Sequence, residues 1–252
     1  MKRIFQIEFK RGFYSAGFYV SILLLVAAGV IGSYSSIEYI RDMGLPEGEI
    51  RFIVTVYQTL YSEAFTFILP IACTLVASAS YLEDLQSGVL RYVMLRTTKK
   101  SYCWSKVINC ALFGMLVIFI AFLLMLVVFF AVFFPNHGEM QYLKTLDIPY
   151  LPQFFQRVVL LGLNGSFYAL LGGTVATVTN NKYMAYAAPF IFYYVISTML
   201  GAYFTDVYII NPKEWLLVRF APPRVILAIL AIVNIIVIIC YSKTMERRCK
   251  NE

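Results

Sequence analysis

Residues 81–106 read YLEDLQSGVLRYVMLRTTKKSYCWSK and separate two strongly apolar parts of the chain. The stretch opens with the acidic pair Glu83 and Asp84 and then turns basic, from Arg91 through to Lys106. The apolar runs on either side approach the roughly 20 residues that a helix needs to cross a bilayer. We therefore interpret 81–106 as a polar loop that connects two membrane spans.

The composition of the whole chain points the same way. Of the 252 residues, 60% are hydrophobic and only 14% are charged, against about 25% charged in a typical soluble domain. The apolar runs are continuous rather than alternating, which favours membrane helices over a membrane barrel. The sequence thus predicts an all-α integral membrane protein with a single transmembrane domain over 1–252.

We expect six transmembrane helices. A proline inside the second apolar run, Pro70, predicts a kink there. Glu63 falls near the outer end of the same run, where a solvated or paired carboxylate is expected. The predicted spans cover about 16–35, 57–80, 107–134, 155–178, 183–204 and 222–242.

Residues 1–14 form a short basic segment ahead of the first span. Phe5, Phe9 and Phe13 recur every four residues, which puts them on one side of a helix. This pattern predicts an amphipathic helix that lies in the headgroup layer. The alternative is a polar lead-in to the first span.

The distribution of basic residues orients the predicted spans. Two thirds of the 21 Lys and Arg residues fall on the side that holds both termini and the 81–106 loop. Positive charge collects on the cytoplasmic side of membrane proteins, so we expect both termini and the loop to be cytoplasmic. The net charge of +7 is explained in this way, without nucleic acid as a partner.

The sequence offers no catalytic or cofactor-binding pattern. The single histidine, His137, has no candidate serine nucleophile near it in sequence, and the cysteines lack metal-ligand spacing. A GxxxxGK[ST] phosphate-binding loop is absent from the sequence. We therefore expect neither an enzyme nor a bound cofactor or metal on this chain.

The polar loop itself has internal order. Gly88 permits a sharp turn, and 89–96 can form a short helix after it. On that helix Arg91 and Leu95 share one face, and an exposed leucine beside an arginine suits an anchor in a partner's groove. The alternative is an ordinary solvated basic loop. We expect the opposite face to rest on the spans through Val89, Leu90, Val93 and Met94.

This order of residues resembles the permeases of the ABC-2 family of ATP-binding-cassette transporters. The resemblance rests on the acidic pair followed by Gly88, the segment LRYVMLR, and then Tyr102 and Lys106. Thr97, Thr98 and Lys99 stand where the family often has a proline. The layout of an N-terminal interfacial helix, six spans and internal termini also resembles this family, whose architecture is that of type V exporters.

The resemblance implies a permease that works as a pair in a bacterial plasma membrane, with a second copy or a homologous permease. A separate cytoplasmic ATPase, which carries ATP and Mg, would grip each half. From the helix geometry, we add Leu95 and Arg96 to the residues expected to contact this ATPase. The residues that the resemblance itself assigns to the contact are Glu83, Asp84, Gly88, Arg91 and Lys106.

Two further groups of residues lie in the fourth and fifth spans. A stripe of small residues in the fourth span suits tight helix packing, with a translocation surface as the alternative. An aromatic cluster in the fifth span suits either a translocation path or anchoring to lipid. The stripe consists of Gly162, Gly165, Ala169, Gly172 and Ala176. The aromatic cluster consists of Tyr186, Phe190, Tyr193 and Tyr194.

These observations together predict a transport subunit that exports an amphipathic or hydrophobic substrate, such as a peptide, an antibiotic or a lipid. Two alternatives stay open. A secondary carrier would work without ATP, and a membrane scaffold or immunity protein would bind a partner without transport.

Overall fold

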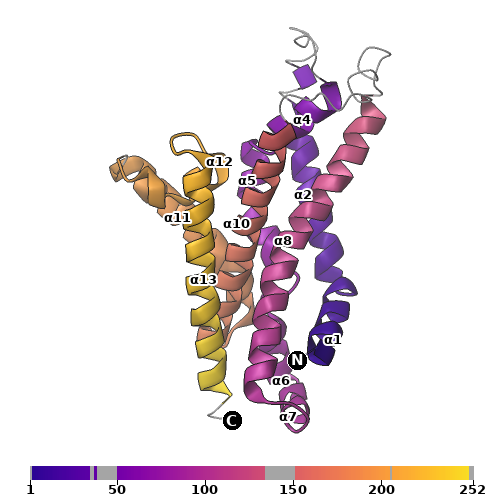
Figure 1. Cartoon of the computed structure of the whole chain (residues 1–252), viewed down its shortest axis with the longest axis vertical. Coiled ribbons are helices and arrows are strands. Elements are labelled where there is room, and N and C mark those ends of the chain that lie inside the picture. The colour runs from indigo at the N-terminus through magenta and orange to yellow at the C-terminus, as the bar shows by residue number, and fades with distance from the viewer. Residues whose placement is uncertain (1, 35–36, 39–49, 134–150, 205, 250–252) are drawn as a thin grey trace.

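The computed structural model describes residues 2–34, 37–38, 50–133, 151–204 and 206–249, and this part of the chain is helical throughout, without strands. Figure 1 shows the helices as one elongated bundle. The helices are α1 (Lys2–Phe13), α2 (Ala16–Gly32), α4 (Arg51–Thr59), α5 (Glu63–Thr74), α6 (Ser80–Gln86), α7 (Val89–Met94), α8 (Lys99–Val132), α10 (Leu151–Thr179), α11 (Lys182–Tyr203), the 3-10 helix η1 (Tyr208–Ile210), α12 (Pro212–Leu217) and α13 (Pro223–Arg248).

Four helices are each long and apolar enough to cross a membrane, namely α8, α10, α11 and α13. Two more spans arise if bent helix pairs are counted: α1 with α2, bent by 52°, and α4 with α5, bent by 64°. The prediction of an all-helical, multi-pass membrane protein is therefore confirmed, with four to six spans in the described part of the chain.

The bend in the second span lies ahead of Pro70 in the chain. Pro70 lies inside α5, which continues to Thr74, whereas the chain bends between α4 and α5. There the Ser62 side chain accepts a hydrogen bond from the backbone N–H of Phe65 and caps a new helix. The predicted kink at Pro70 stays a prediction, and the 64° bend of the span lies ahead of it, where a capping serine starts a new helix.

Helix α8 begins eight residues before the predicted third span. Its cap is Thr98, whose hydroxyl accepts a hydrogen bond from the backbone N–H of Ser101. With 34 residues, α8 is about 51 Å long, well beyond the roughly 30 Å of a bilayer's hydrocarbon core. The last eight residues of the predicted loop, from Lys99 to Lys106, are therefore the first part of a long helix.

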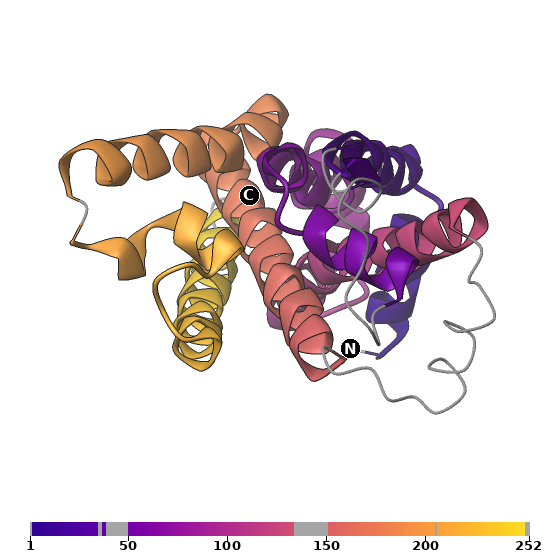
Figure 2. The same ribbon diagram turned by 90° about the horizontal axis from the view of Figure 1, so that it is seen from above.

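Helix α10 occupies the middle of the bundle. It packs against α5 and α8 on one side and against α11 and α13 on the other (Figure 2). Helix α11 leans away from the remaining helices and is the least buried of the four long spans. The short helices α6 and α7 lie at the end of the bundle where α1 begins and α13 ends (Figure 1).

Small residues of α10 lie where other helices approach its backbone. A Cβ atom added to Gly165 would come within 2.4 Å of the Gly114 carbonyl oxygen of α8, and one added to Gly172 within 2.3 Å of the Ala185 carbonyl oxygen of α11. Gly162 faces Phe119 at a looser distance of 3.3 Å. Ala169 and Ala176, the other members of the stripe, are also buried. The stripe thus lets α10 approach α8 and α11 closely.

Candidate functional site: an ionic junction behind α7

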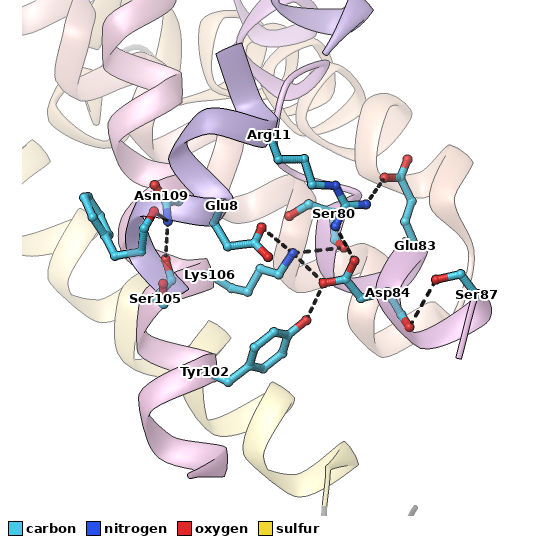
Figure 3. A network of polar contacts seen from close by, with 11 residues as sticks. Glu8, Arg11, Ser80, Glu83, Asp84, Ser87, Tyr102, Ser105, Lys106 and Asn109 are labelled. Carbon is cyan, nitrogen blue, oxygen red and sulfur yellow. Dashed lines mark hydrogen bonds and ion pairs between the residues drawn. The ribbon is translucent and has the colours of Figure 1, made fainter. Parts of the chain in front are cut away.

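The densest polar cluster among the described residues joins α1, α6 and α8 (Figure 3). Helix α6 carries Glu83 and Asp84, and α8 carries Tyr102 and Lys106. We call this cluster the ionic junction. It consists of Glu8, Arg11, Glu83, Asp84, Tyr102 and Lys106.

Asp84 is the centre of the ionic junction. Its side chain is only 2% exposed, and one carboxylate oxygen lies 2.7 Å from Lys106 Nζ. The same oxygen accepts a hydrogen bond of 2.6 Å from the Tyr102 hydroxyl, and the other oxygen pairs with the Arg11 guanidinium. Three donors from two helices therefore converge on one buried carboxylate.

Lys106 connects Asp84 to α1. Its Nζ lies 2.6 Å from the Glu8 carboxylate, and its side chain is 1% exposed. It also donates to the backbone carbonyl of Ser80 at the start of α6, over 3.4 Å. Arg11 reaches Glu83 at 3.4 Å on the exposed rim. Each of the three helices is thus held by at least two polar contacts.

The charges in the ionic junction keep Asp84 ionised. Burial alone would raise the pKa of Asp84, but the positive charge of Lys106 and the hydrogen bonds from Arg11, Lys106 and Tyr102 outweigh it. The net effect lowers the pKa of Asp84 below its usual value. At neutral pH the junction therefore holds a carboxylate between two cations.

Aromatic packing fixes α1 beside this network. Phe9 and Phe13 of α1 contact Phe113 of α8, with ring centroids 5.3 and 5.5 Å apart. Next to them, the Asn109 side chain donates to the backbone carbonyls of Ser105 and Phe5. The phenylalanine face predicted for residues 1–14 thus packs on α8 instead of facing only lipid.

Helix α7 follows Gly88, where the sequence predicted a sharp turn and where the backbone is left-handed, with a φ of +74°. Leu90 is buried, and Val93 and Met94 pack partly against the core, as expected. Val89, by contrast, is 43% exposed and does not belong to the packed face.

The outer surface of α7 is apolar as well as basic. Leu95 is 85% exposed and Tyr92 is 74% exposed, and the exposed Arg91 and Arg96 flank them. Leu95 and both arginines were predicted from the sequence, whereas Tyr92 was not. Tyr92 lies one helical turn before Arg96, and this spacing is the sequence signal that places the two side chains on the same face.

The residues predicted to contact an ATPase therefore separate into two groups. Arg91, Leu95 and Arg96 are exposed on or just after α7, and Glu83 is half-exposed. Asp84 and Lys106 are buried in the ionic junction, so in this conformation their side chains cannot touch a partner. Their assignment to an ATPase contact stays a prediction, and the structure shows them connecting α6 to α8 away from solvent.

The aromatic residues singled out in α11 are not one cluster. Tyr193 and Tyr194 line a cavity of about 220 Å³ together with Glu63 and Lys213, whose charged groups lie 3.9 Å apart. Phe190 stacks against Tyr194. Tyr186 lies apart from them, against a small buried group that includes Leu82 of α6.

The sequence reasoning missed three charged residues that the structure brings into polar clusters. Glu8 and Arg11 are spaced by one helical turn, which places them on one face of α1. Arg157 lies inside the apolar α10 and is 3% exposed. An ionisable residue in an apolar span was the available signal for Arg157.

No group of three potential metal ligands occurs in the described parts of the chain. No protein-family model matches the sequence, and no curated protein matches it significantly. The fold and the ionic junction therefore define the class of protein: a multi-pass helical membrane protein with a short helix held at one end by buried charges.

Proposed function

We propose that the chain is the permease subunit of an ABC transporter of the ABC-2 type, and that α7 is the element which a separate cytoplasmic ATPase grips. The observation that carries this proposal is the exposed side of α7. A short helix that carries an exposed Tyr92 and is followed at once by an exposed Leu95, with arginines beside both, is suited to insertion into a groove of another protein.

Exposed large apolar side chains at a polar membrane face need an explanation. In the proposed orientation α7 lies outside the bilayer, so lipid does not cover Leu95 or Tyr92. Aromatic residues and arginine are the types that dominate binding energy at protein interfaces, and Tyr92, Arg91 and Arg96 supply both. This supports a docked protein partner over a merely solvated loop.

The ionic junction gives such a docking site a mechanical connection to the spans. A partner that displaces α7 pulls on α6 through the turn at Gly88. Asp84 of α6 is paired with Lys106 of α8 and Arg11 of α1, and separating buried charges costs several kcal/mol. A displacement of α7 would therefore move α1, α6 and the start of α8 together.

The remaining parts of the proposal follow from the resemblance. ATP and Mg bind the partner ATPase, and two permease halves, identical or homologous, form the pathway in a bacterial plasma membrane with both termini cytoplasmic. We propose an amphipathic or hydrophobic substrate such as a peptide, an antibiotic or a lipid, moved outward. The mixed aromatic and hydroxyl lining beside Tyr193 and Tyr194 supports an amphipathic cargo.

The test is purification of the tagged chain in a mild detergent, with mass spectrometry of the proteins that come with it. The expected partner is a P-loop ATPase in a fixed ratio. Two single variants, Leu95→Ala and Tyr92→Ala, should each reduce recovery of the ATPase by roughly tenfold, as loss of an interface anchor does. The matched control is Tyr183→Ala, which removes a similarly exposed tyrosine (71%) from the first turn of α11.

The alternatives predict different results. A secondary carrier should purify without an ATPase and should transport with an ion gradient alone. A scaffold or immunity protein should retain a partner without substrate-dependent ATP hydrolysis. Equal recovery of the ATPase with both α7 variants and the control would contradict the assignment of α7.

A further inference from the structure

A second polar cluster lies near the other end of the bundle, around Arg157 of α10. Its Nη2 donates to the backbone carbonyl of Leu60, at 2.9 Å, and its guanidinium carbon lies 3.9 Å from the centre of the Tyr61 ring. Its Nε and Nη1 are buried without a hydrogen-bond partner, and no carboxylate among the described residues pairs with it.

This arrangement leaves the guanidinium incompletely satisfied. Arginine carries five N–H donors, and buried donors in folded proteins nearly always have partners. The Leu60 carbonyl ends α4, so one contact caps that helix. The Tyr61 ring covers one face of the guanidinium. Neither contact accounts for Nε and Nη1 of Arg157.

A small cavity of about 90 Å³ lies against Arg157, roughly the space of three water molecules. Tyr57, Tyr61, Gln153 and Gln156 contribute to its wall, and no carboxylate of the described residues does. Hydroxyl and amide groups can donate hydrogen bonds, so the wall is suited to an anion. The hydroxyls of Tyr57 and Tyr61 form a hydrogen bond with each other over 3.1 Å.

The depth of the cavity favours a particular source of anion. Helix α10 has 29 residues and is about 44 Å long, close to the full thickness of a bilayer with its headgroups. Arg157 lies six residues from its start, which is about 9 Å below that end. This is close to the level at which headgroup and hydrocarbon meet. Lipid phosphates are concentrated there.

We propose that Arg157 and the cavity beside it bind a phosphate-type oxyanion, supplied by the headgroup of an anionic lipid. The guanidinium fork matches two oxygens of a phosphate, and Nε with Nη1 is one edge of that fork. The acyl chains would extend beside α10 into the bilayer. The proposal of this site does not rest on the proposed ATPase partner, because the site lies at the opposite end of the bundle from α7.

The test is native mass spectrometry of the delipidated protein in detergent with three probes. These are phosphatidylglycerol, diacylglycerol with the same acyl chains, and inorganic phosphate alone. The expected result is saturable retention of phosphatidylglycerol and none of diacylglycerol. Arg157→Gln should weaken retention by roughly tenfold or more, because a charge-assisted hydrogen-bond pair is lost. Arg219→Gln, at an exposed arginine on the same side, is the matched control and should have no effect.

A second variant covers the case in which Arg157→Gln fails to fold. Gln156→Leu leaves the Arg157–Leu60 hydrogen bond intact and should weaken retention several-fold at unchanged thermal stability. Retention of inorganic phosphate equal to that of phosphatidylglycerol would overturn the lipid as source. Equal retention of phosphatidylglycerol by the wild type and both cavity variants would overturn the site itself.

Discussion

Lys106 Nζ lies 2.7 Å from a carboxylate oxygen of Asp84, and both side chains are at most 2% exposed. The pair joins α6, the helix that precedes α7, to the lower part of the long helix α8. Glu8 and Arg11 add α1 to the same junction. This buried ion pair is therefore one of the contacts that attach the end of the bundle carrying α7 to the spans.

Replacing Lys106 by Met should destabilise the protein by about 3 kcal/mol, because it leaves the buried Asp84 and the partly buried Glu8 with one cation fewer. Thermal unfolding in detergent, followed by tryptophan fluorescence, measures the change. The double variant Asp84→Asn/Lys106→Met should lose less stability than the two single variants added together, since it removes both charges of the pair.

The control for this prediction is Glu83→Gln. Glu83 is half-exposed and lies 3.4 Å from Arg11, so its loss should cost less than about 1 kcal/mol. Additive losses in the double variant, or equal effects at Glu83 and Lys106, would show that the 2.7 Å contact does not contribute to stability.

The ionic junction should also make stability depend on pH. The pKa of Asp84 is lower in the folded protein than its usual value of about 3.9. Its contribution to stability is therefore complete above that value and is lost as the pH falls through the folded pKa. The difference in unfolding temperature between wild type and Asp84→Asn should stay constant from about pH 5 to 8 and shrink below about pH 4. A difference that grows in acid would contradict the direction of the shift.

Much of the fold could be predicted because apolar runs of membrane length are visible in the sequence. The turn at Gly88 and the packed positions Leu90, Val93 and Met94 follow from local spacing. The bend near Ser62 could not be predicted, because a single serine is a weaker sequence signal for a break in a helix than a proline is. Local sequence signals thus predicted the helices better than the bends and contacts between them.

The ionic junction could not be predicted, because it depends on contacts between residues far apart in the chain. Lys106 meets Asp84 and Glu8 only once α8 begins at Lys99 and α1 folds back against it. From the sequence, Asp84 and Lys106 were members of an exposed polar loop. The extension of α8 by eight residues is what carries Lys106 into the interior.

Gly88→Ala should cost about 1 kcal/mol, because φ at this position is +74° and residues with a Cβ rarely adopt that conformation. The space around Gly88 is open, with no atom within 4 Å of an added Cβ, so the cost is conformational only. Gly88→Asn should cost less, since asparagine tolerates left-handed backbone better than alanine. Thermal unfolding of the two variants side by side makes the comparison. A larger loss with Asn than with Ala would point to a contact at this turn and not to backbone strain.

Gly165→Leu should be among the most damaging single changes in the spans. A Cβ at Gly165 would lie 2.4 Å from the Gly114 carbonyl oxygen, and backbone cannot move aside as a flexible side chain can. We expect a loss of at least about 3 kcal/mol and separation of α8 from α10. The matched control is Gly201→Leu, in α11, where an added Cβ meets nothing within 4 Å. Both variants add the same side chain to a membrane helix. A wild-type unfolding temperature for Gly201→Leu, with a fall of many degrees for Gly165→Leu, would assign the cost to the α8–α10 crossing. Similar unfolding temperatures for the two variants would mean that this crossing has room that the glycine contacts do not indicate.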